Sequence, residues 1–173
     1  MRPFNRIAII LFSVVALIAS LLIVGSLSSR PPNESKITSD FRAHRVAYEQ
    51  VRKMLLDDKG VDGIAPWGVS TTDSPISKMP PDGGMPVKRY QEYLASLKEI
   101  GAVAVAEGKE PLETRFLIWR SGFAGDSRHV AVSWLDREPS NTAMSLDAFY
   151  RTAKPRNPAY IHIDGNWYIW ADW

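Results

Sequence analysis

An uncharged apolar run of 21 residues, Ile7 to Leu27, constrains this chain more than any other feature of its sequence. A helix of that length rises by about 1.5 Å per residue and so spans about 31 Å, which matches the core of a bilayer. Arg2 and Arg6 precede the run and Arg30 follows it. Because the more basic flank stays on the cytoplasmic side, we predict a cytoplasmic stub at residues 1–6 and a transmembrane helix at residues 7–27, with Arg30 weakening the asymmetry.

The remainder of the chain is then expected on the outer side of the cytoplasmic (inner) membrane, as the periplasmic or extracellular part of a single-pass envelope protein. Residues 28–36 are polar and contain Pro31-Pro32, which predicts a short spacer. A cleavable signal segment is the alternative, because Ser26 and Ser28 are small enough to flank a cleavage site. The apolar core of such a signal usually has about 7–15 residues, so the longer run favours an uncleaved anchor.

The excess of basic residues belongs to the flanks of the apolar run. Arg2, Arg6 and Arg30 are among the 21 basic residues behind the formal net charge of +2. Without them, residues 31–173 carry 18 basic and 19 acidic residues, a net charge of −1. Nucleic-acid binding needs a basic stripe, and no dense run of lysine and arginine is present. We therefore expect the lipid bilayer as a partner through Ile7–Leu27, and no nucleic acid.

The chain contains no cysteine, which excludes disulfide scaffolds, thiol catalysis, iron–sulfur clusters and zinc sites with cysteine ligands. Its three histidines, His44, His129 and His162, fall in different predicted elements. A transition metal needs matched faces and a third donor, and the sequence offers neither. No metal site and no cofactor are predicted.

Residues at helical spacing open the region 37–173, which we expect to be the exported domain. They recur in steps of three and four and predict one face of an amphipathic helix that ends near Gly60. These residues are Ile37, Phe41, His44, Tyr48, Val51 and Leu55. The following 27 residues, Gly60 to Pro86, contain five glycines and five prolines, which predicts a long loop. Loops of this length often carry function, and Trp67 lies in this one.

A second helix is predicted from Pro86 to Ile100, with Gly101 as its left-handed stop. A short third helix should begin at Ser145, which is a good N-cap. Strands are expected in five further segments by their apolar character or alternation. These segments are residues 102–106, 115–121, 128–135, 160–163 and 167–172. We therefore predict an α+β domain in which two main helices pack on one face of a roughly five-stranded antiparallel sheet.

A membrane-tethered hydrolase acting on an envelope substrate is one possible function of this domain. Its best candidate residues are Ser121, Asp126 and His129, or the acids Asp62 and Asp73 of the expected loop. Ser121 lacks the preceding glycine of a nucleophile elbow, and no coherent catalytic set emerges. The sequence therefore favours a chain that is not an enzyme, with no catalytic residue.

The C-terminal strand is unusually aromatic. Alternation places Trp167 and Ile169 on one face and Tyr168 and Trp170 on the other. Since one face must be core, the other is either covered or forms an exposed aromatic patch of the kind that marks interfaces. We predict a non-enzymatic accessory or binding domain for an envelope protein or cell-wall partner, with Trp67, Tyr168 and Trp170 as partner-binding residues.

Overall fold

The computed structural model describes residues 31–108, 112–122, 127–152 and 158–172. The predicted cytoplasmic stub, the predicted membrane helix at residues 7–27 and the first part of the predicted spacer lie outside these ranges. In the described part of the chain, no helix is both long enough and apolar enough to cross a bilayer.

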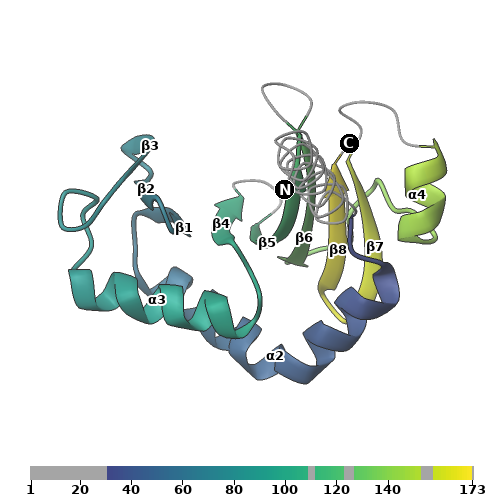
Figure 1. Ribbon diagram of the computed structural model, residues 1–173, viewed down its shortest axis with the longest axis horizontal. Helices are drawn as coiled ribbons and strands as arrows, with labels where there is room; N and C mark the ends of the chain where they lie inside the picture. Colours follow the sequence, from purple (N-terminus) through teal and green to yellow (C-terminus); the bar gives the residue numbers. More distant parts are fainter. Residues whose placement is uncertain (1–30, 109–111, 123–126, 153–157, 173) are drawn as a thin grey trace, which may run out of the picture. The chain divides into compact units, whose positions relative to one another are not determined.

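Eight strands form one antiparallel sheet in the order β3-β2-β1-β4-β5-β6-β8-β7 (Figure 1). The strands are β1 Val61–Ala65, β2 Gly68–Thr71, β3 Ser74–Lys78, β4 Ala104–Gly108, β5 Glu113–Ser121, β6 Arg128–Leu135, β7 Ala159–Asp164 and β8 Trp167–Asp172. The described helices are α2 Glu34–Asp57, α3 Val87–Glu99 and α4 Leu146–Thr152. The predicted five-stranded sheet is therefore wrong: the described structure has eight strands, three more than expected, while the predicted membrane helix at residues 7–27 lies outside the described residues.

The three additional strands all come from residues 60–86, which were expected to form a long loop. These residues form the antiparallel meander β1-β2-β3. Its strands have only four or five residues, too few to show a period in the sequence. Gly68 has a φ of +137°, and a Cβ atom there would lie 2.6 Å from the carbonyl oxygen of Lys78. This glycine reflects close approach of two strands, not a loop.

Both main helices are present as predicted, but α2 begins three residues earlier than expected. The Asn33 side chain caps α2 by accepting a hydrogen bond of 2.8 Å from the backbone N–H of Lys36. The helix starts at Glu34, so it includes the last residues of the predicted spacer. α3 follows Pro86 and stops before Gly101, whose φ of +68° is left-handed.

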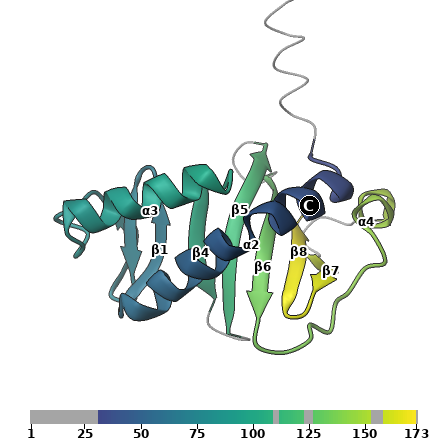
Figure 2. The same cartoon turned by 90° about the horizontal axis from the view of Figure 1, so that it is seen from below.

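The helix α2 and the helix α3 lie across the same face of the sheet (Figure 2). The predicted stripe of α2 is buried there except at His44, where non-helical backbone angles kink the helix. Aromatic rings fill the centre of this core: the Trp167 ring lies 5.0 Å from Phe41, 5.8 Å from Tyr48 and 6.0 Å from Phe116, measured between centroids. This packing fixes α2 on the strands β5 and β8.

The remaining predicted elements are confirmed. β5 pairs with β6 and β7 pairs with β8, both antiparallel, as expected for the two hairpins. Ser145 caps α4, since its Oγ accepts a hydrogen bond of 3.1 Å from the backbone N–H of Ala148. β8 lies between β6 and β7 in the sheet, so the C-terminal strand is central and has neighbours on both sides.

Buried phenols make the fold sensitive to alkaline pH. Burial raises the pKa of Tyr48, Tyr93 and Tyr150 well above the ordinary value, and nearby aspartates raise it further. A pKa that is raised in the folded state contributes stability that is complete below the unfolded value of about 10 and is lost above it. Urea unfolding followed between pH 8 and 11.5 should give a constant free energy up to about pH 10 and a falling one beyond. Tyrosinate absorbance that develops fully near pH 10 without loss of stability would contradict this.

Candidate functional site

The sheet has a second face, here called the outer face, which points away from α2 and α3. Phe116, Val132 and Ile169 form a row across β5, β6 and β8 that belongs to the core under the helices. Because side chains alternate, the neighbouring rows point the other way. These rows are Arg115, Ser133 and Tyr168, and then Leu117, Ala131 and Trp170. The outer face therefore combines aromatic, charged and small side chains.

Two of the three predicted partner-binding residues lie on this outer face but are covered. Tyr168 is 6% exposed and Trp170 is 8% exposed. The guanidinium of Arg115 lies 3.8 Å above the Trp170 ring, and the ring of Tyr160 meets Tyr168 edge-on at 6.2 Å. The aromatic patch that alternation allows on this side is thus closed by side chains from neighbouring strands.

Arg115 reaches Trp170 across the intervening strand β6, where the facing residues are small. Its Nε and Nη2 groups donate hydrogen bonds of 3.0 and 2.6 Å to the carboxylate of Glu113, which is 5% exposed. The Tyr160 hydroxyl lies 3.4 Å from both carboxylate oxygens, and burial followed by the Glu113 charge raises its pKa. The cluster Glu113–Arg115–Tyr160–Trp170 is a closed polar network under the sheet surface.

A cavity of about 530 Å³ adjoins this cluster. Its walls come from the outer face and from the segment that follows β6, including Arg137, Glu138 and Asn141. The Nε and Nη2 donors of Arg115 are already bonded to Glu113. The cluster therefore forms a wall of the cavity and does not supply a reactive group.

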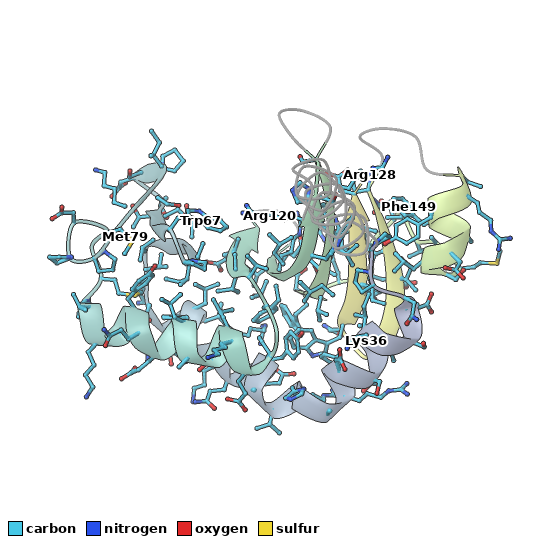
Figure 3. The ribbon with its side chains drawn as sticks, viewed as in Figure 1. Lys36, Trp67, Met79, Arg120, Arg128 and Phe149 are labelled. Atoms are coloured by element: carbon cyan, nitrogen blue, oxygen red, sulfur yellow. The ribbon has the colours of Figure 1, made fainter. Side chains whose placement is uncertain are left out.

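The third predicted residue, Trp67, is 46% exposed in the turn between β1 and β2. Arg120, at the end of β5, places its guanidinium carbon 4.8 Å from the centre of the Trp67 ring (Figure 3). Met79 follows β3 and is 54% exposed. The Tyr90 hydroxyl of α3 contacts two parts of the meander. It donates a hydrogen bond of 2.7 Å to the Ala65 carbonyl of β1 and lies 3.8 Å from the sulfur of Met79. We call Trp67, Met79 and Arg120 the Trp67 surface.

The position of Arg120 depends on a bulge that the sequence does not reveal. Simple alternation from Phe116 places Arg120 on the core face. The register between β5 and β6 shifts between Leu117 and Trp119, however, so that Trp119 pairs with Val130 and Arg120 pairs with His129. The extra residue turns Arg120 to the outer face, where it reaches Trp67.

The candidate hydrolase residues do not assemble. Arg120 pairs with His129 and Ser121 with Arg128, so Ser121 and His129 occupy adjacent rows on opposite faces. Asp126 lies outside the described residues. Asp62 accepts a hydrogen bond of 2.8 Å from Thr72, and Asp73 occupies the exposed turn before β3. Among the residues that the structure describes, no group of three or more histidine, aspartate or glutamate side chains is placed to hold a metal ion.

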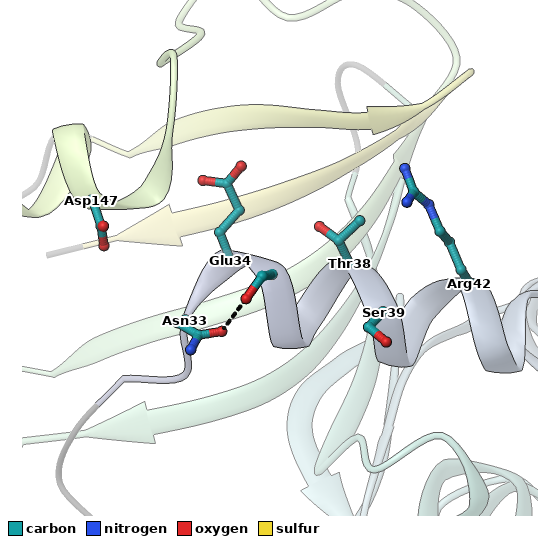
Figure 4. Close-up of a pocket in the computed structure, with 7 residues that line it drawn as sticks. Asn33, Glu34, Thr38, Ser39, Arg42 and Asp147 are labelled. Atoms are coloured by element: carbon teal, nitrogen blue, oxygen red, sulfur yellow. Dashed lines mark hydrogen bonds between the residues drawn. The ribbon is translucent and has the colours of Figure 1, made fainter.

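A wider hollow of about 710 Å³ lies at the start of α2 (Figure 4). Two of its polar residues already serve helix ends. Asn33 accepts hydrogen bonds from Ser35 and Lys36, at 3.0 and 2.8 Å. Glu34 accepts one of 2.7 Å from the backbone N–H of Leu146 and so caps α4. Helix capping therefore accounts for Asn33 and Glu34 at this hollow.

The Trp67 surface has no evident role in holding the fold together. Its tryptophan and its methionine are both exposed, and Arg120 lies over the tryptophan ring. Comparison with known proteins adds no further guide, because no protein-family model, no curated protein and no solved structure matches this chain.

Proposed function

We propose that residues 32–172 form a non-enzymatic binding domain and that a partner protein docks on the Trp67 surface. The observation that carries this proposal is a tryptophan, 46% exposed, held in a turn between two strands with a guanidinium on its ring. Tryptophan and arginine are the residues most enriched at the energetic centres of protein interfaces. Because the turn is part of the sheet, the indole loses little freedom on binding.

A protein suits this surface better than a cell-wall sugar. A sugar ring would stack on an open indole face, and Arg120 already lies over one face of Trp67. The exposed Met79, which follows β3 of the same meander, instead offers an adaptable apolar contact of the kind that protein partners use.

The sequence of residues 7–27 indicates where in the cell this binding takes place. An apolar run of bilayer length with basic residues before it favours a domain held at the outer side of the cytoplasmic membrane. The partner is then another envelope protein, and this chain is an accessory or regulatory component.

Replacing Trp67 by alanine should abolish partner binding while leaving the fold intact. The side chain is half-exposed and outside the core, so we expect the free energy of unfolding to change by no more than about 1 kcal/mol. The test is co-purification of the tagged full chain from solubilised membranes, with Met144→Ala as the matched control. Met144 is an exposed apolar residue before α4, away from the Trp67 surface. Equal recovery of the partner with both variants would contradict the proposal.

A further inference from the structure

Within the part of the chain that the structure describes, arginine stacks on tryptophan at three places. The distance from the guanidinium carbon to the ring centroid is 3.4 Å for Arg52 on Trp134, 3.8 Å for Arg115 on Trp170 and 4.8 Å for Arg120 on Trp67. All three are within the range of a cation–π interaction. The surroundings of the three arginine–tryptophan pairs can therefore be compared with one another.

At one of these places an acidic side chain completes the arrangement, since Arg115 forms an ion pair of 2.6 Å with Glu113. At a second place an acid is only nearby: Arg52 lies 4.0 Å from Glu49, and among the described residues its buried Nε has no hydrogen-bond partner. Stacking engages the flat face of a guanidinium, while the carboxylate meets N–H groups at its edge. The tryptophan, the arginine and the acid are therefore compatible partners, and this chain uses all three together.

The third place lacks the acid. No carboxylate of the described residues forms an ion pair with Arg120. Arg120 itself is exposed, and its indole is far more exposed than that of Trp170. The edge of this guanidinium therefore presents N–H donors beside the apolar surface of Trp67.

We infer that the partner supplies the missing carboxylate: an aspartate or glutamate side chain that pairs with Arg120 while a neighbouring apolar residue covers Trp67. This inference rests on the proposed function and adds the chemistry of the partner. A docked segment excludes water from the pair, which strengthens the attraction between the charges. The arginine is already held on the indole, so little side-chain freedom remains to be lost.

A peptide selection tests the inference with a defined probe. Random 12-residue peptides are selected on the immobilised full chain, and those that also bind the Trp67→Ala variant are discarded. We expect the remaining peptides to carry aspartate or glutamate next to an aromatic or aliphatic residue. Their affinity should fall by about 10- to 100-fold with Arg120→Gln, because a charge-assisted hydrogen-bonded pair is lost. Arg42→Gln, an exposed arginine on α2, is the control and should change nothing.

A double-mutant cycle then assigns the pair. Replacing the peptide acid by its amide should weaken binding as much as Arg120→Gln does, and should cost nothing further on that variant. Peptides that require Trp67 but show no acidic residue and no effect of Arg120→Gln would overturn the inference and leave the docking surface standing. Failure to find any peptide that requires Trp67 would overturn both.

One acid of this chain needs its own control. Asp126 lies between β5 and β6 in the sequence and is outside the described residues. We expect Asp126→Asn to leave peptide affinity unchanged. A rise of about 10-fold would mean that Asp126 competes for Arg120, and that the chain supplies the carboxylate itself.

Discussion

Replacing Arg115 by alanine should destabilise the domain by about 3 kcal/mol, because it leaves a buried carboxylate without its counter-ion. Glu113 is 5% exposed and accepts two hydrogen bonds from Arg115, at 3.0 and 2.6 Å. The Tyr160 hydroxyl, at 3.4 Å, cannot replace a positive charge. The substitution also uncovers Trp170, so packing is lost together with the ion pair. The shift of the urea unfolding midpoint at pH 7 measures the effect.

The double variant Glu113→Gln with Arg115→Met separates charge from packing. It removes both ions and keeps most of the volume, so it should be more stable than Arg115→Ala. An Arg115→Ala variant within about 0.5 kcal/mol of the original chain would show that Glu113 is not held by this pair. That result would contradict the closed network of Glu113, Arg115, Tyr160 and Trp170 on the outer face.

Replacing Trp167 by alanine should cost still more, about 3–5 kcal/mol, the usual range for removing a large aromatic side chain from a core. Trp167 is 1% exposed and contacts both α2 and β5 through Phe41, Tyr48 and Phe116. Its Nε1 donates a hydrogen bond of 3.0 Å to Glu49, so Glu49 also loses a donor. Calorimetric unfolding of the full chain provides the measurement.

The contrast with Trp67 makes this prediction specific. Both residues are tryptophans beside strands of one sheet, yet only Trp167 lies between the sheet and the helix α2. Trp67→Ala should leave the melting temperature nearly unchanged, whereas Trp167→Ala should lower it by well over 10 °C. Similar shifts for the two variants would contradict the assignment of one to the core and the other to the surface.

Helices and tight hairpins were predictable from the sequence because their signals are local. The stripe that begins at Ile37 spans about five turns of α2, and Gly165, with a φ of +55°, makes the turn between β7 and β8. The meander in residues 60–86 was not predictable in the same way. Its strands are shorter than the window that reveals alternation, and its glycines serve strand contacts as well as turns.

The site was predictable only at Trp67, and for a physical reason. Trp170 is covered by Arg115, which comes from a different strand and crosses small residues on β6, and Tyr168 is covered by Tyr160 of β7. Arg120 reaches Trp67 only because a bulge in β5 reverses its face. Both effects depend on strand register. The alternation of residues in a single sequence does not specify that register.

Photo-crosslinking from position 67 tests the central claim most directly. A photoreactive phenylalanine analogue is placed at position 67 of the full chain in the cells that produce it, and at position 144 as a control. We predict one discrete adduct with an envelope protein from position 67, none from position 144, and loss of the adduct when Arg120 is replaced by glutamate. No adduct from position 67, or the same adducts from both positions, would contradict docking at the Trp67 surface.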